Sequence, residues 1–196
     1  MKGYAENKAY GTVEPIKGTN PRQLYEHQKQ AMENLSVMDT EEKYSTLVVL
    51  PTGGGKTYTA STWLLKHAID RNKKILWLAH RHTLLEQAAE SFQKYAYATT
   101  IPHTSSFTYR IISGAVAHDR AVDITAKDNI LIASKDSIGR DLPALDSWLK
   151  GEDELYLVID EAHHSTAKTY RRVIEYLQKK VKHLKLIGLT ATPFRT

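Results

Sequence analysis

The feature that most constrains the fold is a glycine-rich segment between an apolar run, residues 47–50, and a helical pattern, residues 58–69. The glycines let the backbone bend so that several N–H groups point inward, and the start of the helix adds its positive end. A strand, a glycine turn and a helix in this order predict a cradle for an anion such as a chain of phosphates. The segment consists of Leu50, Pro51, Thr52, Gly53, Gly54, Gly55, Lys56 and Thr57.

Two side chains at the end of this segment suit a nucleotide bound to Mg²⁺. Lys56 can reach the β- and γ-phosphates, and the hydroxyl of Thr57 can ligate the metal. The usual pattern has a further glycine five residues before Gly55, where this chain has Leu50, so the match is to the shorter core Thr-Gly-Gly-Gly-Lys-Thr. A glycine-rich turn without a ligand is the alternative, but the flanking strand and helix are what phosphate binding requires.

Length and composition indicate one globular domain. The chain has 196 residues, of which 41% are hydrophobic and 25% charged. It has no cysteine, which excludes disulfides and thiolate zinc sites, and its net charge of +5 is compatible with a polyanionic partner. No apolar signal core begins the chain, and no apolar run approaches the ~18 residues that a membrane span needs. We therefore expect a cytoplasmic protein without membrane contact.

Strand-like runs alternate with helical patterns along the rest of the chain. Near-continuous apolar runs suit strands of a parallel sheet that is covered on both faces. The alternation predicts a doubly wound, mainly parallel α/β fold in three layers. Strands are expected at residues 75–79, 130–133, 155–159, 184–189 and, more weakly, 109–112, and helices at residues 83–95 and 166–180.

The start of the chain is less regular. Residues 1–20 are polar and predict either a loose leader or an edge structure. Asn20 is a good N-cap and Pro21 suits a first helical turn, so a helix is expected to open at Arg22. Gln28 on this helix can present a flat amide to the edge of an adenine, donating and accepting at once. A solvated helix position is the alternative for this glutamine.

Two acids directly follow the apolar run 155–159. Burying Asp160 and Glu161 is costly unless a cation faces them, and a Mg²⁺–nucleotide would supply one. Asp160 would hold the metal through water, and Glu161 would orient or deprotonate the attacking water. Exposed acids that cap the next helix are the alternative. We expect the strand before Asp160 and the strand before the glycine segment to be buried neighbours, which brings their carboxyl ends together.

Five segments, taken in order, resemble the motifs of superfamily 2 helicases. The Asp-Glu-Ala-His sequence, followed by a second histidine, His164, is most similar to the branch of type I and III restriction enzymes and DNA-repair proteins. The resemblance implies a RecA-like P-loop NTPase domain over residues 21–196 that uses ATP and Mg²⁺ to move on nucleic acid. The segments are residues 24–28 (LYEHQ), 51–57 (PTGGGKT), 78–81 (LAHR), 160–163 (DEAH) and 189–193 (LTATP), which resemble the glutamine motif and motifs I, Ia, II and III.

The same resemblance implies roles for single residues. Tyr25 is a departure, because many relatives carry arginine at this position before the glutamine, which leaves the adenine contacts undefined. Thr190 and Thr192 also carry short hydroxyls that could relay the state of the nucleotide by hydrogen bonds. The implied roles are adenine recognition for Gln28, coupling of nucleotide to nucleic acid for His163, Thr190 and Thr192, and backbone contact with nucleic acid for Arg81 and Ser134.

The family's motor has two RecA-like domains with ATP between them, and the motifs found here belong to the first. We expect the second domain, whose arginine finger is worth ~10³–10⁵ in rate, to be absent from this chain. The chain alone would then bind nucleotide and hydrolyse it poorly. Expected partners are nucleic acid, as double-stranded DNA bound through its phosphates, the second domain, and nuclease or methylase subunits. A nucleotide-gated nucleic-acid-binding module and an unrelated P-loop ATPase are the alternatives.

Overall fold

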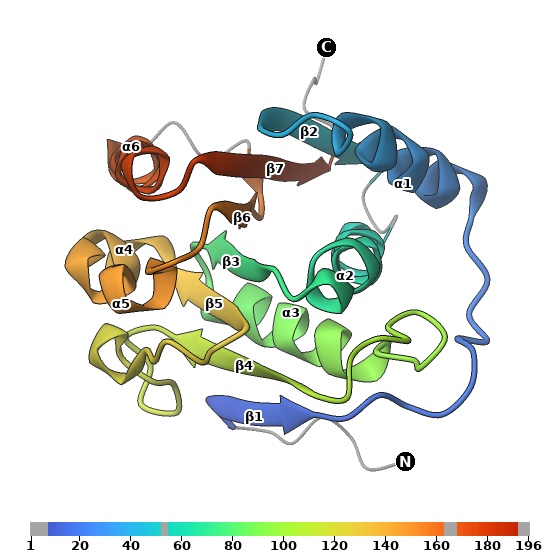
Figure 1. Cartoon of the computed structure of the whole chain (residues 1–196), viewed down its shortest axis with the longest axis horizontal. Helices are drawn as coiled ribbons and strands as arrows, with labels where there is room; N and C mark the ends of the chain where they lie inside the picture. Colours follow the sequence, from blue (N-terminus) through green and yellow to red (C-terminus); the bar gives the residue numbers. More distant parts are fainter. Residues whose placement is uncertain (1–7, 52–54, 163–167, 192–196) are drawn as a thin grey trace.

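The computed structural model describes residues 8–51, 55–162 and 168–191. A seven-stranded sheet runs through the molecule in the order β1-β4-β5-β3-β6-β7-β2 (Figure 1). Every neighbouring pair is parallel except β1 with β4. The strands are β1 (Tyr10–Val13), β2 (Tyr44–Leu50), β3 (Lys74–Ala79), β4 (Phe107–Ile112), β5 (Ile130–Ser134), β6 (Glu154–Ile159) and β7 (His183–Ala191).

Helices cover both faces of the sheet and complete the three layers (Figure 1). The first three pack against one face and the last three against the other, and each face has its own buried apolar cluster. The predicted doubly wound, mainly parallel fold is thereby confirmed. The helices are α1 (Glu26–Met38), α2 (Lys56–His67), α3 (His82–Lys94), α4 (Lys135–Gly139), α5 (Asp146–Leu149) and α6 (Lys168–Lys180).

The central strand β3 explains why the apolar runs predicted this sheet. All six of its residues are buried. Trp77 points into the cluster under α1, α2 and α3, whereas Leu76 and Leu78 belong to the cluster under α4, α5 and α6. Successive strand residues face opposite sides, so a strand that is covered on both faces is apolar along most of its length. In β3 the exception is the first residue, Lys74. None of the helices in the described ranges has the length and apolarity needed to cross a bilayer.

The expected helix start at Asn20 and Pro21 is wrong, because α1 begins only at Glu26. The Asn20 side chain has other partners: its Oδ1 accepts a hydrogen bond from the Arg22 backbone N–H at 2.9 Å, and its Nδ2 donates to the Tyr58 hydroxyl at 2.9 Å. The asparagine thus closes a turn and joins it to α2. Of the two alternatives for residues 1–20, an edge structure is present, since β1 pairs antiparallel with β4.

The expectation that the strands before Lys56 and Asp160 are buried neighbours is also wrong. Strand β7 lies between β6 and β2, so β2 is an edge strand of the described sheet. Two of its apolar side chains are half exposed, Leu47 at 50% and Val49 at 45%. Local apolar patterning predicts that a strand exists, but the order of strands depends on how the intervening helices cross the sheet.

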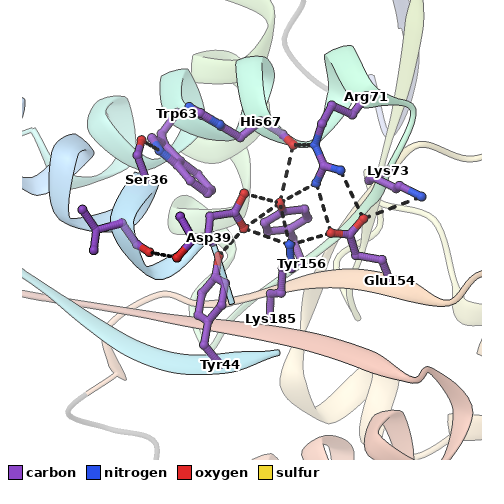
Figure 2. A network of polar contacts seen from close by, with 12 residues as sticks. Ser36, Asp39, Tyr44, Trp63, His67, Arg71, Lys73, Glu154, Tyr156 and Lys185 are labelled. Atoms are coloured by element: carbon purple, nitrogen blue, oxygen red, sulfur yellow. Dashed lines mark hydrogen bonds and ion pairs between the residues drawn. The ribbon is translucent and has the colours of Figure 1, made fainter. Parts of the chain in front are cut away.

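A polar network joins the amino-terminal ends of β6 and β7 to the end of α1 (Figure 2). The Tyr156 hydroxyl donates to Asp39 Oδ1 at 2.8 Å, and the buried ammonium of Lys185 lies 3.0 Å from the same oxygen. Lys185 Nζ also lies 2.5 Å from Glu154 Oε1, and Arg71 Nη2 donates a hydrogen bond to the same oxygen at 3.1 Å. Charges of both signs therefore satisfy one another at this end of the sheet.

The Glu154 carboxylate makes this network sensitive to pH. Burial alone would raise the pKa of Glu154, but hydrogen bonds from Arg71 and Lys185, together with their charges, outweigh it and lower the pKa from 4.5 to about 2. A lowered pKa means that the carboxylate stabilises the fold above about pH 4.5. This contribution is lost as the pH falls from 4.5 toward 2.

We expect Glu154→Gln to lower the free energy of unfolding at pH 7 by about 1–3 kcal/mol, because it removes hydrogen bonds to a charged group. The difference from the parent should shrink between pH 4.5 and pH 2, where the parent carboxylate takes up a proton. Urea unfolding at a series of pH values measures both effects. Glu33→Gln, at an exposed position of α1, is the control and should change little. A difference that stays constant with pH would contradict the assignment.

Candidate active site

The predicted phosphate-binding lysine and the two predicted acids meet at the carboxyl ends of β2 and β6. Lys56 is the first residue of α2, and Asp160 directly follows β6. Lys56 Nζ lies 2.6 Å from Asp160 Oδ1 and 3.4 Å from Glu161 Oε1. The lysine side chain thus bridges the two motifs even though β7 separates their strands. An ammonium and two carboxylates form one cluster where ligands of doubly wound sheets bind.

Asp160 is fully buried, and Lys56 satisfies one of its carboxylate oxygens, Oδ1. Its Oδ2 has no hydrogen-bond partner within the part of the chain that the structure describes. An unsatisfied buried carboxylate oxygen is costly, and a bound cation or its water would satisfy it. Thr57 follows Lys56 at the start of α2 and carries a hydroxyl. Carboxylate, hydroxyl and water oxygens are the ligands that Mg²⁺ prefers, so the residues present fit this metal.

Glu161 has an unusual backbone. Its φ is 57°, in the left-handed region, which costs a residue with a side chain roughly 1–2 kcal/mol. Two cations help to hold the carboxylate in place: Lys56 at 3.4 Å, and Arg81 Nη2 at 3.9 Å from Oε1. Arg81 is the N-cap residue of α3, and its side chain is 60% exposed. The structure thus brings Arg81, for which the resemblance implies contact with nucleic acid, close to Glu161, which is expected to orient or deprotonate the attacking water.

Gln28 lies against the end of the glycine segment. It is 1% exposed, so the alternative of a solvated helix position is wrong. Its Oε1 accepts a hydrogen bond from the Tyr25 backbone N–H at 3.0 Å. Gly55 is the N-cap residue of α2 with a φ of 72°, and a Cβ built on it would lie only 2.6 Å from Gln28 Nε2. Gly55 must therefore be glycine both for its backbone conformation and for the approach of Gln28.

The remaining predicted residues have varied positions. Ser134 caps α4, since its hydroxyl accepts a hydrogen bond from the Ser137 backbone N–H at 3.2 Å and donates to the Ser137 hydroxyl at 2.8 Å. Thr190 is buried in β7, and Pro51 is exposed just after β2. The predicted residues that lie outside the described ranges are Thr52, Gly53, Gly54, His163 and Thr192.

Sequence reasoning missed two residues beside the site. Tyr170 on α6 has a buried hydroxyl without a partner among the described residues. Burial and the nearby charge of Asp160 raise the pKa of Tyr170 to about 12. Arg22 lies near Gly55, with its Nη2 3.7 Å from the position of a Cβ on that glycine. Neither carries a local sequence signal, because Tyr170 occupies an apolar position of a helix and Arg22 lies in a polar segment.

Comparison with known proteins gives a family and a fold. Residues 22–195 match the family described as "Type III restriction enzyme, res subunit". The "DEAD-box ATP-dependent DNA helicase Fancm" of Drosophila melanogaster is 29% identical over 157 residues, 78% of this chain and 10% of that protein. The "ATP-dependent DNA helicase MPH1" of Saccharomyces cerevisiae is 30% identical over 151 residues, 76% of this chain and 14% of that protein.

A solved structure supports the fold. The UvsW helicase from bacteriophage T4 matches with a TM-score of 0.59 and 18% identity, over 90% of this chain and 56% of that chain. At this identity the likeness concerns the arrangement of strands and helices. The chain spans only 10% and 14% of the length of the two curated relatives.

The contact between Gly55 and Gln28 can be tested by a double-mutant cycle. Gly55→Ala should lower the free energy of unfolding by about 1–2 kcal/mol for its φ alone, and by more because the new Cβ meets Gln28. Combined with Gln28→Ala, the loss should fall short of the sum of the single losses by about 1 kcal/mol. Urea unfolding measures the cycle.

Gly114→Ala is the matched control, since a Cβ at Gly114 would meet nothing within 4 Å, and it should change stability little. Strictly additive losses in the cycle would show that the two side chains do not meet.

Proposed function

We propose that this chain is an ATP-driven motor domain acting on nucleic acid. The chain belongs to the family of type III restriction enzyme res subunits, as the N-terminal RecA-like domain of a superfamily 2 helicase. Residues 21–196 would form this domain. The observation that supports the proposal most is the cluster of Lys56 with Asp160 and Glu161 at the carboxyl ends of β2 and β6. The names of the two relatives favour DNA as the nucleic acid. We propose that the motor moves along duplex DNA.

The cluster suggests how the nucleotide would be handled. Asp160 and Thr57 would hold Mg²⁺, whose charge stabilises the negative charge that develops on the phosphates. Lys56 would exchange the Asp160 oxygen for β- and γ-phosphate oxygens. Glu161 would accept a proton from the attacking water or orient it.

Recognition and coupling would use the surrounding residues. Gln28, beside Gly55, would read the edge of adenine. Arg81 is exposed and close to Glu161, so it could contact a nucleic-acid phosphate and respond to the state of the site. Such contacts go to the backbone and are therefore independent of base sequence and sensitive to salt. As the resemblance to superfamily 2 helicases implies, we also propose that Ser134 contacts the nucleic-acid backbone. We likewise propose that nucleotide binding is coupled to nucleic-acid binding by His163, Thr190 and Thr192.

Full turnover would require a second RecA-like domain, and nuclease or methylase subunits are proposed as further partners. An arginine finger from the second domain is typically worth ~10³–10⁵ in rate. We therefore infer that the 196-residue chain binds MgATP but hydrolyses it slowly. Rapid hydrolysis by the chain alone would contradict this part of the proposal.

We expect Lys56→Ala to weaken binding of MgATP to the 196-residue chain by about 10–100-fold, because it removes charged hydrogen bonds to phosphate. Isothermal titration calorimetry measures the affinity. Lys66→Ala changes an exposed lysine on the same helix and should bind like the parent. Parent-like affinity of Lys56→Ala, in a variant shown to be folded by circular dichroism, would overturn the assignment.

We expect Glu161→Gln to keep MgATP affinity close to that of the parent while turnover falls about 10²–10⁴-fold, the usual share of general acid–base catalysis. The measurement is phosphate release, with and without duplex DNA, in a polypeptide that carries both RecA-like domains. Glu175→Gln, exposed on α6, is the control. Undiminished turnover in Glu161→Gln would remove its role.

The same preparation separates the alternatives. An ATPase that DNA does not stimulate would favour an unrelated P-loop ATPase. A DNA-stimulated ATPase that cannot displace the third strand of a triplex would favour a nucleotide-gated binding module.

A further inference from the structure

Arg81 and Glu161 follow two neighbouring strands of the sheet. Strands β3 and β6 run parallel, with Leu78 in register with Ile159, so both segments leave the sheet at the same edge (Figure 1). The backbone N–H of Asp160 still donates a hydrogen bond to the Leu78 carbonyl at 2.8 Å. The two side chains therefore meet just beyond the paired strands, where Arg81 Nη2 lies 3.9 Å from Glu161 Oε1.

The backbone of Arg81 is held in place, but its side chain is open to solvent. Arg81 is the N-cap residue of α3, and its carbonyl accepts hydrogen bonds from the backbone N–H groups of Leu84 and Leu85 at 3.1 and 3.4 Å. Its side chain is 60% exposed, whereas that of Glu161 is 16% exposed. An anion from solution can therefore approach the guanidinium, while the carboxylate is the more enclosed partner.

Two cations share the same oxygen of Glu161. Lys56 Nζ lies 3.4 Å from Oε1 and 2.6 Å from Asp160 Oδ1. A row of alternating charges thus leads from the exposed surface to the buried aspartate: Arg81, Glu161, Lys56 and Asp160. A change at the exposed end of this row alters the charge that surrounds Glu161.

The contact of Arg81 with Glu161 is the weak link of this row. At 3.9 Å the two atoms are too far apart for a hydrogen bond, and an ion pair with an exposed partner is weak and sensitive to salt. A phosphate group can accept two hydrogen bonds from one guanidinium. A backbone phosphate of nucleic acid would therefore compete well with Glu161 for Arg81.

We propose that Arg81 exchanges partners when nucleic acid binds: it holds the Glu161 carboxylate in the chain without nucleic acid and releases it to take a backbone phosphate. The inference rests on the proposed function, since it makes Arg81 a positioning residue that acts through Glu161. The released carboxylate is then available to the attacking water. Nucleic acid would thus raise the rate of hydrolysis without a change of fold.

The test measures DNA binding in the absence of nucleotide, so it does not depend on hydrolysis. Fluorescence anisotropy follows a short labelled DNA duplex titrated with the 196-residue chain at low salt. Because the chain must break the ion pair to bind DNA, Glu161→Gln should tighten binding about two- to fivefold. In the Arg81→Ala background the same change should have little effect. Arg81→Lys keeps the charge, so Glu161→Gln should still tighten binding there.

Two control variants account for the change of charge alone. Glu90→Gln removes an exposed acid from α3 that is not a partner in the ion pair. Its effect on DNA binding should be the same in the parent and in the Arg81→Ala background. Lys66→Ala removes an exposed cation from α2 and should leave the effect of Glu161→Gln intact. Circular dichroism checks that each variant is folded.

A second readout is ATP turnover by a polypeptide that carries both RecA-like domains. Arg81→Ala should raise turnover without DNA about two- to fivefold, because the carboxylate is already released. Stimulation by DNA should fall in the same variant. A residue that only contacts DNA would leave the rate without DNA unchanged.

Three results would overturn the proposal. Equal tightening by Glu161→Gln in the parent and in Arg81→Ala would show that the carboxylate repels DNA without acting through Arg81. Unchanged or weaker DNA binding by Glu161→Gln in the parent would show that the ion pair does not compete with DNA. A parent-like rate of Arg81→Ala without DNA would show that the pair does not restrain the carboxylate.

These outcomes are distinct from failure of the function on which the inference rests. If the parent chain binds no DNA, the nucleic-acid part of the proposed function and the inference fail together. If Lys56→Ala binds MgATP like the parent, the assignment of the ATP site fails, while the DNA titrations still decide the inference. If the parent binds both ligands and the effects of Arg81→Ala and Glu161→Gln are additive, the inference alone fails.

Discussion

The structure around the site depends on one electrostatic constraint: the buried carboxylate of Asp160 needs a cation. Its side chain is 0% exposed, and Lys56 supplies the charge at 2.6 Å from a position 104 residues earlier in the chain. Leaving one partner of such a pair alone costs about 3–5 kcal/mol. The end of β6 and the start of α2 are therefore held together. A ligand that drew Lys56 away would have to leave a cation in its place, so binding of phosphate and binding of a metal at this site would be linked.

This pairing across β7 also depends on a small residue in the intervening strand. Gly188 pairs with Ile159 on β6 and with Leu47 on β2. A Cβ built on Gly188 would lie 3.0 Å from both Ala162 Cβ and Leu47 Cδ1. The absence of a side chain lets the turn after β6 lie close over β7. The acids that begin this turn can thus approach α2 although their strand is not the neighbour of β2.

The sequence predicted the parts of this arrangement that depend on local chemistry. Near-continuous apolar strands predicted the covered parallel sheet, and parallel strands necessarily present Lys56 and Asp160 at the same edge. The position of β7 between β6 and β2 was not predictable, since it depends on helix packing that no single segment records. Asn20 looked like a helix cap because its partner Tyr58, 38 residues away, cannot be read from local pattern. Arg22 escaped notice for the same reason.

The two ends of β6 differ in a way that favours ligand binding at one of them. At the amino-terminal end, Glu154 is paired with Arg71 and Lys185, so the polar groups there satisfy one another. At the carboxyl end, Asp160 Oδ2 has no partner among the described residues, and Glu161 has a strained backbone. Unsatisfied buried atoms and strain persist only where the surroundings enforce them, which is typical of functional sites. The satisfied network fixes the strand, and the unsatisfied end keeps the capacity to bind.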